Sequence, residues 1–187
     1  MANPWDLPPL PTHGDDNEDV TFTAVGRVMT QWESIEFELA RLYSTFVGKP
    51  DDYRALREYG RGRIFRDRLN DTKRAADTFF VTSPGQDVEG GFLEIETYTQ
   101  GFSERRNDTA HGVVFKISGL SYFADRLDPS VQNKPQFALI PMLTVIRRHD
   151  DEWMPVYAYT SRELMTLHDS LVLLSHEISE FRLHFLR

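Results

Sequence analysis

The 187-residue chain contains no cysteine, so neither disulfide bonds nor thiolate metal sites are available to it. It also lacks an apolar run of the length that a membrane-spanning helix needs. Its first residues are rich in proline and acidic residues, without the basic and apolar segments of a secretory signal. These absences predict a soluble protein of the cytoplasm that has no membrane partner.

Two further kinds of site have little support in the sequence. No segment has the glycine and lysine spacing of a phosphate-binding loop, so no nucleotide cofactor is expected. Three histidines near the C-terminus are eight residues apart and would drift around a helix instead of sharing a face: His168, His176 and His184. We therefore expect no metal site and no cofactor.

Acidic and basic residues are unevenly distributed along the chain. The formal charge of −8 argues against a protein that coats nucleic acid generally, because such a protein needs a basic surface. Residues 1–19 hold five acidic residues and no lysine or arginine, whereas residues 54–74 hold eight basic residues against three acidic ones. The second segment predicts one basic face, whose candidate RNA-binding residues are Arg61, Arg63 and Arg66. The alternative is a solvated helix face on which Asp67 and Asp71 neutralise the arginines locally.

Most of the chain has helical periodicity, with apolar residues recurring every three or four positions. The expected helices cover about 19–46, 51–59, 64–80, 88–111 and a last segment that begins at 160. In the first helix the predicted buried stripe consists of Phe22, Val25, Met29, Trp32, Ile35, Leu39, Leu42, Tyr43 and Phe46. Thr160 and Glu163 have the spacing of a capping box, which predicts the start of the last helix.

The remaining segments predict an extended lead and a small β insertion. Residues 1–18 contain four prolines and an acidic run, so they have little to bury, although Trp5 and Leu10 could dock them locally. Residues 113–160 are rich in β-branched and aromatic residues, which predicts three or four short strands, around 113–117, 137–140 and 153–157. We therefore expect a mainly α fold: a lead over 1–18, then one helical domain over 19–187 with the β insertion before its C-terminal helix.

The stretch that carries most chemistry is Arg-Arg-Asn-Asp-Thr-Ala-His-Gly, residues 105–112. Arginine presents a permanently charged planar fork suited to phosphate, and histidine is the side chain whose unperturbed pKa lies nearest neutrality. On a continuous helix Arg106 and His111 point about 140° apart, so they share a face only if the helix ends between them. Gly112 is the residue expected to end it, as a C′ glycine.

The run Glu-Arg-Arg-Asn-x-x-Ala-His-Gly, with an upstream helix containing Trp-Glu-Ser-Ile-Glu at 32–36 and Leu39, resembles the HEPN superfamily of all-helical domains. The family motif is Arg, four to six residues, then His, often with a polar residue after the Arg. Here those positions are Arg106, Asn107 and His111. The resemblance covers about residues 20–112 plus the final helix, and it implies a HEPN-like helical bundle.

The resemblance also implies a function, since many HEPN proteins are metal-independent endoribonucleases. In that chemistry the RNA 2′-hydroxyl attacks its adjacent phosphate. His111 would move the proton, Arg106 would stabilise the phosphorane charge, and Asn107 would orient the histidine or the phosphate. Family members commonly form homodimers in which two motifs meet. A homodimer, RNA, and an antitoxin or other protein partner in a toxin or defence system are therefore the expected partners.

Glu36 and Arg105 are expected to support this site. Glu36 lies within the predicted stripe, between Trp32 and Leu39, where an apolar residue would be expected. A carboxylate there needs a partner, and the candidates are an arginine of the motif or a core hydroxyl. The alternative is that Glu36 lies at the edge of the stripe and reaches solvent.

Two other functional classes fit the same sequence. One is a non-catalytic HEPN-like module that binds a nucleotide, RNA or a protein. The HEPN branch paired with nucleotidyltransferases has Tyr two residues after the His, where this chain has Val113. The other is a structural helical domain, in which Arg106 forms a buried ion pair and His111 is a hydrogen-bonded residue at a helix end.

Overall fold

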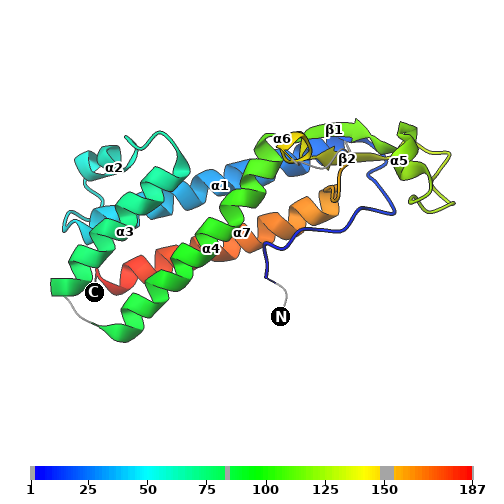
Figure 1. The fold of residues 1–187 in the computed structure, drawn as a ribbon. Coiled ribbons are helices and arrows are strands. Elements are labelled where there is room, and N and C mark those ends of the chain that lie inside the picture. Colours follow the sequence, from blue (N-terminus) through cyan, green and yellow to red (C-terminus); the bar gives the residue numbers. More distant parts are fainter. Residues whose placement is uncertain (1–2, 83–84, 148–153, 187) are drawn as a thin grey trace. The chain divides into compact units, whose positions relative to one another are not determined.

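The computed structural model describes residues 3–82, 85–147 and 154–186. Within these ranges the chain is mainly helical, with a small antiparallel sheet before the C-terminal helix, as the sequence predicts (Figure 1). Its elements are α1 (Glu18–Phe46), α2 (Tyr53–Tyr59), α3 (Phe65–Thr82), α4 (Gln86–Ala110), β1 (Val113–Lys116), η1 (Ile117–Gly119), α5 (Ser121–Ala124), β2 (Phe137–Ile140), α6 (Met142–Arg147) and α7 (Ser161–His184). None of the helices in the described ranges combines the length and apolar character needed to cross a bilayer.

The chain forms two compact units, and the three long helices α1, α4 and α7 contribute to both. Unit 1 comprises residues 1–31 and 104–170, and unit 2 comprises residues 32–103 and 171–187. Residues 3–18 of the predicted lead belong to unit 1.

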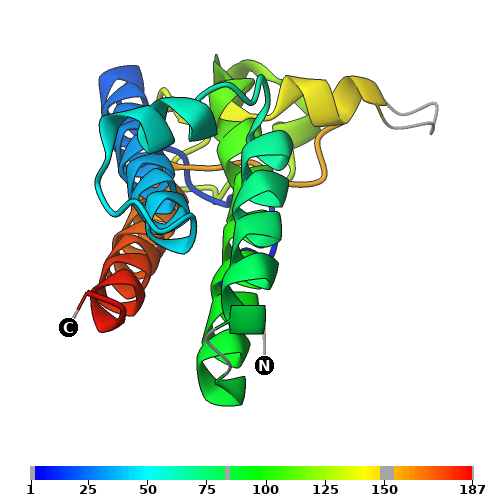
Figure 2. The same ribbon diagram turned by 90° about the vertical axis from the view of Figure 1, so that its left-hand side faces the viewer.

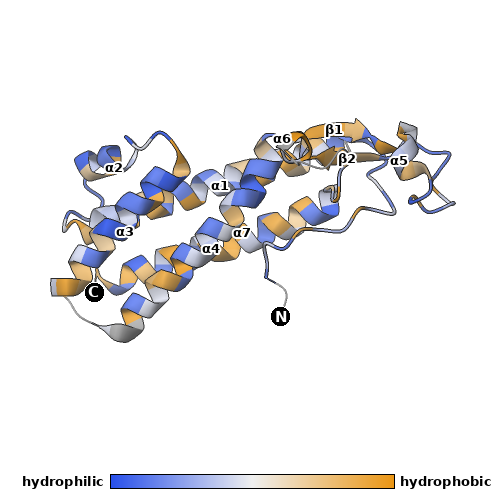
Figure 3. Ribbon diagram, viewed as in Figure 1, coloured by the Kyte–Doolittle hydropathy of each residue, from blue (hydrophilic) through white to orange (hydrophobic). Residues whose placement is uncertain are grey.

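The core of unit 1 is built on the two strands. β1 and β2 pair antiparallel from Val113 opposite Ile140 to Lys116 opposite Phe137, and both are hydrophobic over most of their length (Figure 3). The residues buried with this sheet include Ile117, Phe123, Leu127, Ala138, Ile140, Val145 and Ala158.

The prediction of a third strand around 153–157 is wrong for residues 154–157, which form no strand; Trp153 lies outside the residues that the structure describes. Pro155 has no N–H to donate to a ladder. This segment pairs with β2 only after Pro155. There Tyr159 and Leu139 form an isolated bridge and exchange backbone hydrogen bonds of 2.8 and 2.9 Å.

The lead is extended, but part of it is firmly docked. Asp15 exchanges two 2.8 Å backbone hydrogen bonds with Phe137, the first residue of β2. Its carboxylate accepts hydrogen bonds from the Ser161 N–H and hydroxyl and from the Thr21 hydroxyl. The Asp15 carboxylate thus satisfies the first N–H group of α7, that of Ser161. Glu163 accepts from the Thr160 N–H, as the capping box predicts. Leu10 packs against the core of unit 1, as expected.

The start of α1 faces inward through different residues from those predicted. Thr21, Ala24 and Val28 are buried, whereas Phe22 is 53% exposed. The Thr21 hydroxyl donates a 2.6 Å hydrogen bond to the Asp15 carboxylate. This contact orients the Thr21 face of the start of α1 toward the protein interior. From Trp32 onward the predicted stripe is confirmed: Trp32, Ile35, Leu39, Leu42, Tyr43 and Phe46 are all buried.

Unit 2 packs around a cluster of aromatic rings contributed by α1, α3, α4 and the end of the chain. Ring centroids within it lie 5.2 to 6.4 Å apart, and its members are Phe46, Phe79, Phe80, Phe92 and Phe185. Helices α3 and α4 lie side by side (Figures 1 and 2). The ammonium group of Lys73 on α3 lies 2.7 Å from the Glu96 carboxylate on α4.

Candidate functional site at the end of helix α4

Helix α4 continues through most of the Arg-Arg-Asn stretch. It extends to Ala110, and the His111 N–H still donates a 3.0 Å hydrogen bond to the Asn107 carbonyl. Helical hydrogen bonding therefore continues from Arg106 up to His111. Within one chain their backbone positions keep the side chains about 140° apart around the helix axis.

Gly112 follows the helix end, but not as the predicted C′ glycine. It does not have the left-handed backbone of a C′ glycine. Instead, an added Cβ would lie 2.6 Å from Cγ of Leu139 and 2.8 Å from the carbonyl oxygen of Asp108. Glycine is required because β2 and the end of α4 approach each other so closely.

The structure brings Asn107 and His111 together. They are one helical turn apart and share a face, where both line a cavity of about 160 Å³ that is also bordered by Asp108, Pro141, Leu143 and Thr144. Both side chains are exposed. Arg106, which is partly buried, is not among the residues that line this cavity. The cavity therefore offers an imidazole and an amide to a ligand, but not the predicted arginine.

Asp108 also lines this cavity and is only 7% exposed. Its carboxylate accepts hydrogen bonds from the Thr144 hydroxyl at 3.1 Å and the Tyr159 hydroxyl at 3.0 Å. Nη1 of Arg105 lies 3.4 Å from it. Sequence reasoning missed Asp108, although its i,i+3 spacing from Arg105 is a signal for an ion pair on one helix.

Arg105, predicted as a supporting residue, is 9% exposed and lines a different cavity from the one lined by Asn107 and His111. Its guanidinium lies between Asp108 and Glu104 and 5.9 Å from the ring centroid of Tyr157. Burial, and then the charge of Asp108, raise the pKa of Tyr159 well above its usual value. Burial also raises the pKa of Tyr157. These tyrosines stay protonated at neutral pH, so Tyr159 remains a donor to Asp108.

Glu36 has a partner other than the motif arginines. Its carboxylate accepts hydrogen bonds from Nη2 and Nε of Arg68 at 2.5 and 2.8 Å, and from the Tyr59 hydroxyl at 3.0 Å. The prediction of an inward carboxylate near a core hydroxyl is thus correct, whereas the solvent-facing alternative is wrong. The predicted pairing with the motif is replaced by a pairing within unit 2, with an arginine that the sequence placed on the outer face of α3.

The three predicted RNA-binding arginines, Arg61, Arg63 and Arg66, are exposed in unit 2. The local neutralisation considered as an alternative is only partly present. Asp71 pairs with Arg74, and none of the three arginines lies within ion-pair distance of a carboxylate in the described part of the chain. Their charges remain available to solvent or to a ligand.

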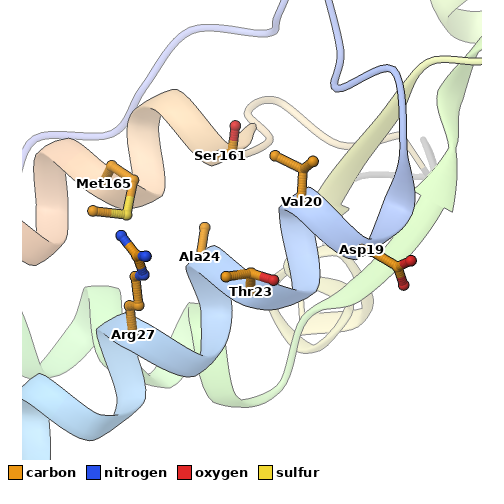
Figure 4. A pocket seen from close by; sticks show the side chains of 7 residues that line it. All are labelled: Asp19, Val20, Thr23, Ala24, Arg27, Ser161 and Met165. Carbon is orange, nitrogen blue, oxygen red and sulfur yellow. The ribbon is translucent and has the colours of Figure 1, made fainter.

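A larger cavity, of about 360 Å³, lies elsewhere in unit 1, between the starts of α1 and α7 (Figure 4). Its lining consists of Asp19, Val20, Thr23, Ala24, Arg27, Ser161 and Met165, with Arg27 pointing across toward Met165. None of the predicted site residues reaches it. The Ser161 hydroxyl in this lining donates a 2.6 Å hydrogen bond to Asp15, the carboxylate that caps α7, so its contact has a structural role and the cavity offers binding volume without an evident reaction.

Comparison with models of known protein families, with curated proteins and with solved structures finds no match to this chain. The resemblance to the HEPN superfamily therefore remains a prediction. Among the residues that the structure describes, no three His, Asp or Glu side chains are arranged to hold a metal ion.

Proposed function

We propose that the chain is a metal-independent endoribonuclease of HEPN type, acting in the cytoplasm within a toxin or defence system. The observation that carries the proposal is the exposed pair of Asn107 and His111 in one open cavity. Imidazole is suited to moving a proton at neutral pH. A neighbouring amide can donate a hydrogen bond to a phosphate oxygen.

In the proposed reaction His111 accepts the proton of an RNA 2′-hydroxyl, and the oxygen attacks the adjacent phosphorus. The O2′–P bond forms as the P–O5′ bond breaks; the leaving 5′ oxygen takes a proton from water, and the protonated His111 releases its proton to solvent. The products are a 2′,3′-cyclic phosphate and a 5′-hydroxyl. Asn107 orients the phosphate, and DNA is not cleaved because it lacks the 2′-hydroxyl.

The charge on the phosphorane requires a cation, for which the motif provides Arg106. Since Arg106 and His111 lie on different faces of α4, we propose a homodimer in which the Arg106 of one chain acts with the His111 of the other. A two-fold axis would create two such composite sites. A protein antitoxin is a further proposed partner.

The experiment is RNA cleavage by the purified chain in EDTA, with analysis of the product ends. We expect a 2′,3′-cyclic phosphate and a loss of about 100- to 10,000-fold in rate for His111→Ala. Arg106→Ala should also be strongly impaired. His176→Ala, which changes another exposed histidine, is the matched control and should retain activity.

Mixing the two inactive variants tests the composite site. A heterodimer of Arg106→Ala and His111→Ala chains has one site with both groups intact, so random mixing should restore about a quarter of wild-type activity. If each site lies within one chain, mixing restores none. No cleavage of varied RNA substrates by the folded wild-type dimer would contradict the proposed activity.

A non-catalytic binding module is the second candidate, and one observation favours it. The cavity that contains His111 is lined by neither Arg105 nor Arg106. A single chain therefore presents no arginine to a phosphate there. This candidate predicts RNA binding without cleavage in the same experiment.

A further inference from the structure

The basic residues of unit 2 fall into two groups. One group is engaged with carboxylates: Arg41, Arg68, Lys73, Arg74 and Arg182. The other group is exposed, and none of its members lies within ion-pair distance of an acid among the described residues: Lys49, Arg54, Arg57, Arg61, Arg63 and Arg66. The five arginines of this group lie within one short segment that runs from α2 into the first turn of α3.

The five exposed arginines form a stripe along the sequence. Arg54 and Arg57 are three residues apart and share a face of α2, whereas Arg61 and Arg63 lie in the turn between α2 and α3, and Arg66 lies in the first turn of α3. Residues 53–66 contain Glu58 as their only acid. A stripe of unpaired guanidinium groups on an acidic protein fits a chain of phosphates.

The loop that carries Arg61 and Arg63 is held in place by the Glu36–Arg68 pair. Nη1 of Arg68 donates a 2.9 Å hydrogen bond to the Gly62 carbonyl, while its other nitrogens bind Glu36. A Cβ on Gly62 would lie 2.7 Å from Cγ of Arg68, so the glycine lets this side chain pass. Fixing the loop before binding lowers the entropy cost of ordering the arginines on a ligand.

An aromatic ring lies at the start of the same stripe. Tyr53 is 71% exposed, and the guanidinium carbon of Arg57 lies 5.8 Å from its ring centroid. Solvent-facing aromatic rings beside cationic side chains are the combination that binds single strands, because unpaired bases stack on the ring while arginines contact the backbone.

We propose that Tyr53, Arg54, Arg57, Arg61, Arg63 and Arg66, here called the arginine surface, bind single-stranded RNA. The guanidinium groups contact successive phosphates, and the Tyr53 ring stacks on a base. The choice of RNA over DNA rests on the proposed function, whereas the phosphate and stacking contacts do not. The surface would hold substrate independently of the residues that cleave it.

The test is fluorescence anisotropy with a labelled 2′-O-methyl oligoribonucleotide, which cannot be cleaved through its 2′ oxygen. The triple variant Arg61→Glu/Arg63→Glu/Arg66→Glu should bind the oligonucleotide much more weakly than wild type. In a plot of log affinity against log salt concentration, the slope for this variant should be shallower by about 2, or roughly 0.7 per lost phosphate contact. Tyr53→Ala should weaken binding by roughly 5- to 100-fold. The control with the same charge change is Arg27→Glu/Lys134→Glu/Arg162→Glu, three exposed sites of unit 1.

Near-wild-type binding by the control, with weak binding by the other two variants and unchanged circular dichroism, supports the arginine surface. Equal loss for both triple variants would show that only net charge matters and would overturn it. Undiminished binding by Tyr53→Ala, or equal competition by heparin, would overturn single-strand recognition. Wild-type binding without cleavage of ordinary RNA would contradict the proposed function while leaving this surface intact.

Discussion

At the scale of single residues, the end of α4 is packed so closely that one methyl group matters. Gly112 lies against Leu139, which is almost fully buried, and against the backbone carbonyl of Asp108. The carbonyl cannot rotate away as a flexible side chain could. Any larger residue must push β2 away from the helix end and so disturb the cavity that contains His111.

We therefore expect Gly112→Ala to lower the free energy of unfolding by about 1–3 kcal/mol, the usual cost of overpacking. Gly26→Ala is the matched control, because Gly26 lies within α1 and a Cβ there meets nothing within 4 Å. That control should be neutral or stabilising by up to about 1 kcal/mol, since alanine favours helix. Urea unfolding of both variants provides the measurement, and equal stabilities would contradict the steric account.

At the scale of elements, the Glu36–Arg68 ion pair links α1 to α3, and Arg68 also binds the Gly62 carbonyl in the loop before α3. Glu36 also accepts from Tyr59 of α2, and burial, followed by the Glu36 charge, raises the pKa of Tyr59. Three elements thus depend on one carboxylate. Glu36 interrupts the apolar stripe of α1 because it organises the segment that presents the arginine surface.

Arg68→Ala should lower the free energy of unfolding by about 2–3 kcal/mol, because it leaves the Glu36 carboxylate largely buried with less compensation. The amides of Arg61–Arg63 should also exchange hydrogen faster. Arg74→Ala is the control on the same helix, where the exposed pair with Asp71 contributes about 0–1 kcal/mol. A double-mutant cycle between Glu36 and Arg68 should show coupling between their effects on the free energy of unfolding. Additive effects would contradict a direct stabilising interaction between the two side chains.

At the scale of the whole chain, Asp51 connects helices from opposite ends of the sequence. It follows α1, has a left-handed backbone with φ of 58°, and accepts hydrogen bonds from Arg41 at 2.8 Å and Arg182 at 3.2 Å. Arg182 on α7 is almost fully buried. The hydrogen bond from Arg41, followed by the charge of Arg182, lowers the pKa of Asp51.

Asp51→Asn should lower the free energy of unfolding at pH 7 by about 1 kcal/mol, while keeping a residue that tolerates left-handed backbone. Because the folded-state pKa is lowered, this stability is present above the unfolded carboxyl pKa, near 4, and is lost as pH falls. The difference from wild type should therefore shrink below about pH 4. Asp52→Asn is the neighbouring control, because Asn caps α2 as well as Asp does. A difference that stayed constant with pH would contradict this assignment.

Much of the candidate site was visible in the sequence, because its parts are local. Asn107 and His111 share a face through helical spacing alone. Asp108 was missed because the residues that bury it, Thr144 and Tyr159, are 36 and 51 positions away. Arg105 was predicted as a supporting residue because it belongs to the motif stretch, and nothing in that stretch shows its burial.

The sequence by itself determined α1 to α4 and α7, the strands around 113–117 and 137–140, and the capping box of α7, because periodicity, β-branching and capping act over a few residues; the short helices η1, α5 and α6 lie where only a β insertion was expected. Only the tertiary structure decided that Glu36 pairs with Arg68, that Asp15 caps α7, and that Phe22 faces solvent. Each of these depends on which partner a polar group finds across a long stretch of chain. Burial makes such pairing necessary, but local spacing does not specify the partner.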